Sequence, residues 1–359
     1  MKLCIIAPVP PPYGGIANWV QLMKEHIKQK QDVIDLTIVN TAPKIRSTEG
    51  RTLWNRVVDS GIAMIKQYKE LKQIIKGECT DVIHITTSGQ LAVIRDILFL
   101  SLSKRNGIPT VYHIRFGRIM QIAEKNTIEW KLISIAMGLA SRVIAIDNTT
   151  YRAIKTYLTK VNVVCIPNPI DISSMPSQAF NGSKTIMFLG WVIKTKGIEE
   201  LLTAWEDVHK EYDDWKMRIV GPCRDEYFEH LKSKYSFDGV IYEGEKTHEN
   251  AMEILNSSEI FILPSYTEGF PNVILEAMAL SKPIIATRVG AIPDMLADDC
   301  GLLINPEDSK DIIKALKFLF SNKNKCTEIA DNANQRLKKN YTIEIVFHKY
   351  TNVWRNLLS

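Results

Sequence analysis

Two carboxylates at a fixed spacing mark the stretch of this chain that carries the most chemistry. Glu268 and Glu276 have seven residues between them, and Asn272 precedes Glu276 by four, a spacing that puts Asn272 and Glu276 on one face of a helix. The loop 268–271 would leave free backbone N–H groups at the helix N-terminus, which favour an anionic group. The two carboxylates can accept hydrogen bonds from hydroxyl groups, and the backbone N–H groups between them can bind a phosphate. A nucleotide sugar has these parts: ribose and sugar hydroxyls and a diphosphate.

The elements that must position these groups follow from the segment 260–290. The sequence predicts strand, loop, helix and strand, because an apolar run leads into loop residues and Pro271 suits the first helical position. An isolated pair of glutamates at this spacing is more often surface charge, but the order of loop, proline and apolar helix favours a binding site. The predicted elements are a strand over 260–263, a loop over 264–269, a helix over 273–280 that ends at Lys282-Pro283, and a strand from 284 to 286.

This segment resembles the E-x7-E signature of the retaining glycosyltransferases of family 4. The resemblance covers nearly the whole chain and is strongest over 185–310. It implies the GT-B fold, in which two facing Rossmann-like α/β domains with parallel sheets enclose a cleft. It also implies that Glu268 lies near the donor sugar and that Glu276 holds the ribose. The implied donor-binding residues are Gly14, Gly15, Gly190, Gly269, Phe270, Asn272, Val273 and Glu276.

A glycine pair follows the first predicted strand. Gly14-Gly15 separates the apolar residues 2–8 from a helical segment over 16–29, and a strand, turn and helix bring backbone close to a phosphate. The G-x-G-x-x-G fingerprint is absent, which argues against a dinucleotide site. The pair could be an ordinary tight turn, whereas the family resemblance implies a loop that faces the donor diphosphate.

A second cationic position follows the strand predicted over 184–189. Lys196-Gly197 precedes a helix predicted over 198–210 and matches the family's K-G pair, where a lysine neutralises the diphosphate. Trp191 stands where the family has an arginine. We therefore expect Lys196 to carry more of the leaving-group charge, or Lys194 or Arg288 to substitute. The alternative for Lys196 is a solvated loop lysine.

The first half of the chain offers a third candidate group. His113 ends a strand predicted over 109–114, and ligands of α/β sheets collect at the carboxyl ends of strands. A lone histidine is more often structural, but the family resemblance implies that this one touches the donor sugar. We count it with Glu268 and Lys196 as a catalytic candidate, and Arg115 and Arg118 as candidates for contacting an acceptor phosphate.

Composition and charge bound the remaining possibilities. The 359 residues suit two domains, and six scattered cysteines without a C-x-x-C pair favour neither a zinc site nor a disulfide framework. Residues 1–170 carry 23 Lys and Arg against 12 Asp and Glu, a net charge of +11, whereas the remainder carries 22 against 28, a net −6. The expected divisions are an acceptor-binding domain over 1–170, a linker over 171–183, a nucleotide-sugar domain over 184–340, and a helix over 341–359 that packs back toward the first domain.

The basic first half could face anionic lipid. A helix predicted over 54–75 combines apolar residues with Lys66, Lys69, Lys72 and Lys76, which is typical both of a core-facing helix with a solvated side and of a membrane-surface helix. No apolar run is long enough to span a membrane, and no compact basic tract indicates nucleic acid. We expect a cytoplasmic enzyme. The basic first half would allow it to bind as a peripheral protein to the inner face of the plasma membrane.

Together these features predict a retaining glycosyltransferase that moves a sugar from a UDP-linked donor to a glycan or lipid-linked glycan. Such a hexosyltransferase would serve cell-surface polysaccharide synthesis, such as O-antigen or capsule. No D-x-D motif stands at a strand end, so we expect no metal and no cofactor. The alternatives are a non-catalytic nucleotide-sugar-binding module, a synthase of the same fold that uses a small soluble acceptor, and a nucleotide-sugar epimerase.

Overall fold

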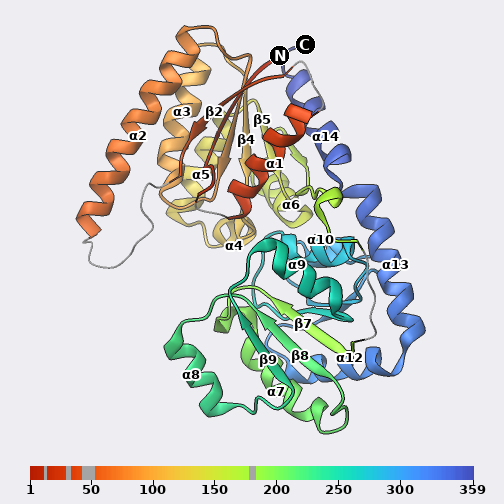
Figure 1. The fold of residues 1–359 in the computed structure, drawn as a ribbon. Coiled ribbons are helices and arrows are strands. Elements are labelled where there is room, and N and C mark those ends of the chain that lie inside the picture. Colours follow the sequence, from red (N-terminus) through yellow and green to blue (C-terminus); the bar gives the residue numbers. More distant parts are fainter. Residues whose placement is uncertain (12–13, 30–33, 43–52, 178–182) are drawn as a thin grey trace. The chain divides into compact units, whose positions relative to one another are not determined.

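The computed structural model divides the chain into two compact units (Figure 1). Unit 1 comprises Met1–Pro169 and Ile343–Ser359, and unit 2 comprises Ile170–Thr342. The described residues are 1–11, 14–29, 34–42, 53–177 and 183–359, with the backbone alone for 53–60. Within this part of the chain, no helix has the length and apolar character that crossing a bilayer requires.

Unit 1 is built on a six-stranded parallel sheet with the strand order β2-β1-β3-β4-β5-β6. Its strands are short apolar runs that helices cover on both faces, as parallel sheets require. The strands are β1 (Lys2–Ala7), β2 (Asp35–Asn40), β3 (Val82–Thr87), β4 (Thr110–Ile114), β5 (Arg142–Ala145) and β6 (Val163–Cys165). The helices are α1 (Gly15–Gln29), α2 (Leu53–Lys76), α3 (Ala92–Arg105), α4 (Ile119–Glu124), α5 (Ile128–Leu139), α6 (Asn148–Tyr157) and α14 (Ile343–Arg355).

Alternating residues of these strands feed two separate cores. On β4, Tyr112 and Ile114 join a core with α2 to α6, whereas Val111 joins a second core with α1 and α14. This alternation follows from the period of two in a strand. The last helix of the chain therefore belongs to unit 1, where Tyr350 and Trp354 are fully buried.

Unit 2 has its own six-stranded parallel sheet, with the order β12-β11-β10-β7-β8-β9. Counted from β7 this is the Rossmann order 3-2-1-4-5-6. The strands are β7 (Thr185–Leu189), β8 (Lys216–Val220), β9 (Val240–Gly244), β10 (Ile260–Leu263), β11 (Ile284–Thr287) and β12 (Leu302–Ile304). The helices are α7 (Ile198–His209), α8 (Asp225–Lys234), α9 (His248–Ser257), α10 (Asn272–Ala279), α11 (Ile292–Met295), α12 (Ser309–Ser321) and α13 (Lys323–Asn340), with the short 3-10 helices η1 (Ile172–Ser174) and η2 (Lys194–Lys196).

The predicted fold class is confirmed, since both sheets are parallel and Rossmann-like. The predicted first helical residue of the motif differs: Pro271 is the N-cap of α10, and Asn272 is the first helical residue. The backbone of Pro271 is extended, with ψ of 113°, so its C=O still closes the first turn by accepting from Ile274. Part of the predicted linker, 178–182, lies outside the described residues.

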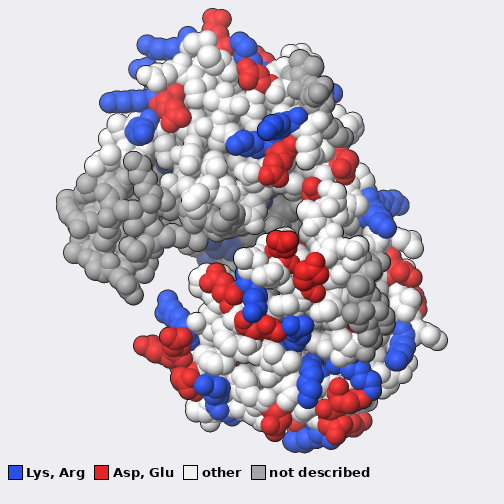
Figure 2. Space-filling model, in the orientation of Figure 1, with Lys and Arg blue, Asp and Glu red and all other residues white. Residues whose placement is uncertain are grey.

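Charge is distributed differently in the two units. On the face shown in Figure 2, Lys and Arg of unit 2 lie among Asp and Glu. Among the described residues, the ion pairs of unit 1 are Arg95–Asp96 and Arg118–Glu129, whereas the others all lie in unit 2. Most of the described Lys and Arg residues of unit 1 therefore form no ion pair.

Candidate functional site

The sheet of unit 2 has its topological switch point between β7 and β10, which are direct neighbours in the sheet. The loop after β7 contains Lys196, and the loop after β10 contains Glu268. Ligands of doubly wound sheets bind outside the carboxyl ends of the strands at such a point. The fold therefore explains why two motifs far apart in the sequence meet at one sheet edge.

Lys196 and Glu268 form a direct ion pair. The Nζ of Lys196 lies 2.6 Å from Oε1 of Glu268, and the side chains are 26% and 11% exposed. The Ser265 hydroxyl donates to the same carboxylate oxygen at 2.7 Å. With two donors fixed on Oε1, the carboxylate is oriented, while the lysine ammonium keeps further N–H donors for a ligand.

Two glycines allow the loops around this pair to approach each other. Gly197 has a φ of +71°, and a Cβ there would lie 2.1 Å from the carbonyl oxygen of Pro264. Gly290 has a φ of +54°, and a Cβ there would lie 2.2 Å from the carbonyl oxygen of Glu268. Ala291 N–H also donates to the Gly269 carbonyl. Both flanks of the β10–α10 loop are therefore held by backbone contacts that a side chain would disrupt.

The second glutamate of the motif lies one helix turn into α10. Glu276 is 13% exposed in its side chain, and its Oε1 is 3.1 Å from Nε2 of His248, the first residue of α9. The hydrogen bond that His248 donates to Glu276 raises the pKa of His248, although burial opposes the shift. Glu276 is thus a carboxylate with one oxygen engaged by a titratable neighbour.

The N-terminus of α10 lies between the two glutamates. Within the described chain, no side chain caps this helix, and the Ile274 N–H closes its first turn on the Pro271 carbonyl. A helix N-terminus favours an anionic group. Phe270 is half-buried on the core of unit 2, with its ring centroid 6.0 Å from that of Tyr341. Gly269, Phe270, Asn272 and Val273 are all partly exposed around this helix start.

The surroundings of Lys196 show where further cations could come from. Trp191, in the position of the family arginine, is 60% exposed. Lys194 and Arg288 are also exposed, and in the described part of the chain neither forms an ion pair. Gly190 directly follows β7, and its N–H donates to the Val220 carbonyl. The only cation bound to Glu268 among the described residues is therefore Lys196.

In unit 1, the glycine pair lies after β1 at the start of α1. Gly14 and Gly15 are exposed, and the Gly14 carbonyl accepts from Asn18. Arg115, which follows β4, donates from Nη2 to the Gly15 carbonyl at 3.2 Å and stacks on Trp19 at 5.1 Å. Burial lowers the pKa of Arg115 to about 10, so the guanidinium remains charged at neutral pH. The arginine fixes the glycine turn.

Arg118 is also engaged within unit 1. Its Nη2 lies 2.5 Å from Oε1 of Glu129, and its guanidinium stacks on Phe116 at 4.5 Å. The same carboxylate oxygen accepts from the Gln90 N–H at 2.6 Å. The Arg118 side chain is 33% exposed. To contact an acceptor phosphate, Arg118 would use the guanidinium N–H groups that Glu129 does not occupy.

His113 is fully buried on the face of the sheet that α1 and α14 cover. Its Nδ1 is 3.1 Å from Nε2 of His84, and the Trp354 indole N–H lies 3.0 Å from Nδ1 of His84. Burial lowers the pKa of His113 well below its usual range, and Arg115 and His84 lower it further. The sequence-predicted histidine is thus neutral and part of a chain of rings.

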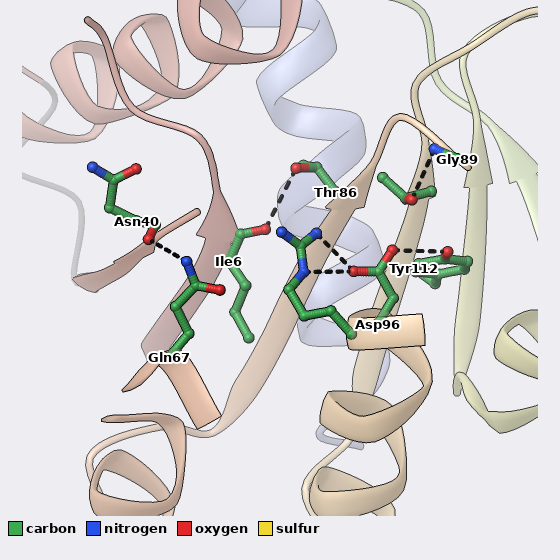
Figure 3. Close-up of polar contacts among 9 residues, drawn as sticks. Ile6, Asn40, Gln67, Thr86, Gly89, Asp96 and Tyr112 are labelled. Atoms are coloured by element: carbon green, nitrogen blue, oxygen red, sulfur yellow. Dashed lines mark hydrogen bonds and ion pairs between the residues drawn. The ribbon is translucent and has the colours of Figure 1, made fainter. Parts of the chain in front are cut away.

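The opposite face of the same sheet carries a charged polar network instead (Figure 3). Asp96 is fully buried on α3 and accepts from Arg95 at 2.8 Å and from the Tyr112 hydroxyl at 3.1 Å. Burial raises the pKa of Asp96, which its partners partly offset. This network joins α3 to β4, next to the turn in which Gly89 N–H donates to the Thr87 hydroxyl.

The structure brings some predicted residues together and adds others. Glu268 and Lys196 meet, and Glu276 and Asn272 lie on α10. Sequence reasoning missed Ser265, His248, His84 and Trp354. A signal existed for His84 alone, because His84 and His113 lie on neighbouring strands with the same inward phase. Within the described residues, no group of three or more His, Cys, Asp or Glu side chains could hold a metal ion.

Residues 170–336 match the family described as glycosyl transferases group 1. Among curated proteins, the chain is 28% identical over 200 residues to an uncharacterized glycosyltransferase of Haemophilus influenzae, covering 55% of each chain. It is 23% identical over 275 residues to the capsular polysaccharide biosynthesis glycosyltransferase CapM of Staphylococcus aureus, covering 69% of this chain and 70% of CapM. The match thus spans about half the length of the first relative.

Solved structures share the fold along nearly the whole chain. Sucrose-phosphate synthase of Thermosynechococcus elongatus matches with a TM-score of 0.78 and 16% identity, covering 99% of this chain and 98% of that one. Anabaena HepE in complex with UDP matches with a TM-score of 0.72 and 15% identity, covering 99% and 100%. At these identities the likeness shows the fold alone.

Proposed function

Because residues 170–336 match the glycosyl transferases group 1 family, we propose that this chain is a retaining glycosyltransferase. It moves a sugar from a nucleotide-sugar donor to a glycan or lipid-linked glycan of the cell surface. The observation that carries the proposal is the ion pair between Lys196 and Glu268, 2.6 Å apart at the switch point of the unit 2 sheet. That pair lies in the two loops flanking the point where such sheets bind nucleotides.

The chemistry requires stabilisation of two opposite charges. As the bond between the anomeric carbon and the phosphate oxygen breaks, positive charge develops on the sugar and negative charge on the diphosphate. The Lys196 ammonium and the first N–H groups of α10 would stabilise the diphosphate. Glu268, held by Lys196 and Ser265, would orient the sugar, and Glu276 would accept hydrogen bonds from the ribose.

The acceptor hydroxyl supplies the new bond to the sugar and the proton that the leaving group takes up. Its oxygen bonds to the anomeric carbon on the face that the diphosphate leaves, and its proton passes to a leaving phosphate oxygen. No dedicated general base is needed for this route. We propose that the reaction uses no metal and no other cofactor; loss of activity in EDTA with recovery on adding magnesium would contradict this.

UDP is the proposed nucleotide, and capsule or related surface polysaccharide the proposed product class. The solved complex of Anabaena HepE with UDP supports the first, and the capsular polysaccharide biosynthesis glycosyltransferase CapM supports the second. Both relatives are distant in sequence, so the base and the sugar require direct measurement.

The decisive experiment starts with a thermal-shift panel of UDP-, GDP-, ADP- and TDP-sugars on the purified chain, since a ligand of the folded state raises Tm. The sugar that gives the largest shift is then incubated with lipid-linked and soluble glycan acceptors. We expect nucleoside diphosphate release coupled to a glycosylated product. No shift and no turnover with any donor would overturn the proposal.

A nucleotide-sugar-binding module is the second candidate, and Trp191 is the observation that favours it. The exposed indole replaces a cation that would otherwise help neutralise the diphosphate. A binding module would show the thermal shift for a nucleotide sugar but neither hydrolyse nor transfer it. The turnover measurement therefore separates the two candidates.

We also propose peripheral binding of unit 1 to anionic lipid through α2. Lys66, Lys69, Lys72 and Lys76 are exposed on this helix, together with Ile62 and Ile65 at 63% and 55% exposure. Exposed apolar residues among lysines favour an anionic membrane surface. Flotation with phosphatidylglycerol liposomes should carry the protein upward, whereas protein that stays at the bottom would reject this.

A further inference from the structure

Three ring side chains of unit 1 form a hydrogen-bonded chain through its interior. The indole Nε1 of Trp354, on α14, lies 3.0 Å from Nδ1 of His84, on β3. The other ring nitrogen of His84, Nε2, lies 3.1 Å from Nδ1 of His113, on β4. All three side chains are fully buried.

The indole at one end sets the direction of every hydrogen bond. An indole N–H can only donate, so Nδ1 of His84 must be the acceptor. A neutral His84 then carries its proton on Nε2 and donates it to Nδ1 of His113. His113 in turn carries its own proton on Nε2. The two histidines therefore have fixed tautomers, which a lone buried histidine would not have.

The surroundings keep both rings neutral, which the directional argument requires. The ring of Trp19 lies 5.2 Å from that of His84 and 5.4 Å from that of His113, and Tyr350 lies 5.7 Å from His113. Burial and the nearby Arg115 lower the pKa of His84 to about 3. A protonated ring, with donors on both nitrogens, is thus disfavoured at physiological pH.

We infer that Trp354 and His84 are positioning residues that make His113 a hydrogen-bond donor through Nε2, directed at an oxygen of the bound substrate. Nε2 of His113 is buried and has no hydrogen-bond partner among the described residues, and buried N–H groups are seldom left without an acceptor. The substrate part of this inference rests on the proposed glycosyltransferase function. A consequence is that the neutral ring cannot accept a proton at Nε2, so His113 is not a general base.

The tautomers can be measured without any substrate. The full chain, labelled with ¹⁵N in its histidine rings, is examined by long-range ¹H–¹⁵N NMR, and the two resonances are assigned with His84→Gln and His113→Gln. We expect a protonated Nε2 and an unprotonated Nδ1 in both His84 and His113. A proton on Nδ1 of either ring in the wild-type protein would overturn the inference.

Three variants test the relay itself. Trp354→Phe keeps a ring but removes the indole N–H, and should allow His84 and His113 to exchange tautomers. His84→Leu removes the donor to His113, whereas His84→Gln supplies an amide N–H in a similar place. We expect mixed His113 tautomers in His84→Leu and the wild-type tautomer in His84→Gln. Unchanged His113 resonances in a folded His84→Leu variant would contradict the relay.

Kinetics with the donor selected by thermal shift connect the relay to the substrate. His84→Leu should lower kcat/KM about tenfold, the scale of one hydrogen bond, and His84→Gln should restore most of it. Wild-type kcat/KM in His84→Leu with altered tautomers would reject the role of His113 in substrate binding. If the wild-type protein turns over no nucleotide sugar, the proposed function fails, and the NMR result still decides whether the relay exists.

Discussion

The two units place different chemistry at the carboxyl ends of similar sheets. In unit 2, the groups after β7 and β10 are charged and partly exposed, as Lys196 and Glu268 show. In unit 1, His113 near the end of β4 and His84 in the middle of the neighbouring β3 are neutral and fully buried. A partly solvated ion pair can exchange partners when a charged ligand arrives, whereas a buried neutral ring chain can only present donors that are already fixed.

Changes in the two units should also differ in whether they affect activity or stability. The ion pair of unit 2 contributes little to folding because it is near the surface, so its removal should affect chemistry most. The ring chain of unit 1 is part of a core, so its perturbation should affect stability as well as any substrate contact. The predictions below test each side of this contrast with a matched control.

Replacing Lys196 by alanine should have the largest effect. The ammonium would stabilise diphosphate charge that develops during bond cleavage, so kcat should fall about 10²- to 10³-fold, with little change in Tm. Lys310→Ala, at the exposed start of α12 and without an ion pair among the described residues, is the control. Steady-state kinetics with the selected donor measure both, and near-wild-type kcat in Lys196→Ala would refute the assignment.

Gly197→Ala should be the most damaging change to folding. At a φ of +71° the new Cβ would lie 2.1 Å from the Pro264 carbonyl oxygen, so strain and steric clash add to at least about 3 kcal/mol. Gly244→Ala has nearly the same φ, +70°, but open space around the Cβ, and should cost about 1 kcal/mol. The loss in the free energy of unfolding, measured in urea for both variants, isolates the contribution of the clash. Equal losses would show that the loops carrying Gly197 and Pro264 move apart without cost.

The sequence predicts much of unit 2 because its signals are local. Apolar runs mark strands that are buried on both faces, and the motif from Glu268 to Glu276 spans a single loop and helix. The start of α10 was wrong by one residue because a proline suits both the N-cap and the first helical position. Such boundaries depend on backbone angles that composition does not encode.

The contacts that sequence reasoning could not predict are long-range. His248 reaches Glu276 across 28 residues, and Trp354 reaches His84 across 270. Arg115, expected to face an acceptor phosphate, also packs on Trp19 and the Gly15 carbonyl. Each of these contacts depends on how helices pack on a sheet, and no residue spacing in the chain specifies that packing.

The buried histidines predict how stability depends on pH. Because burial lowers the pKa of His84 from 6.5 to about 3, the unfolded chain binds a proton below about pH 6.5 that the folded chain does not bind. The free energy of unfolding should therefore fall as pH drops from about 6.5 toward 3, by about 1.4 kcal/mol per pH unit for each such histidine.

The variant His84→Gln tests this contribution, with His348→Gln on the exposed side of α14 as its control. Unfolding in urea between pH 7 and pH 4.5 gives the slope for each protein. Wild-type and His348→Gln should share one slope, and that of His84→Gln should be shallower by about 1.4 kcal/mol per pH unit. The same slope in all three would show that His84 is protonated in the folded state.

The smallest expected effect concerns the pair between His248 and Glu276. Glu276 raises the pKa of His248, so as pH falls the histidine becomes charged and binds the carboxylate more tightly. Ribose hydroxyls must then compete with this pair for Glu276. Because His248 is 60% exposed, solvent screens the interaction, and the Kd for UDP should rise only about two- to threefold between pH 8 and pH 6.

His248→Gln keeps an amide donor near Glu276 without a titratable charge. Calorimetric titration with UDP at both pH values should show a smaller pH dependence for His248→Gln than for the wild-type protein, since the titration of UDP itself is common to both. Glu276→Gln should weaken UDP binding at either pH, because it replaces a carboxylate acceptor by an amide. Identical pH dependence in wild type and His248→Gln would mean that ribose binding does not compete with the histidine, leaving Glu276 able to hold both through its two oxygens.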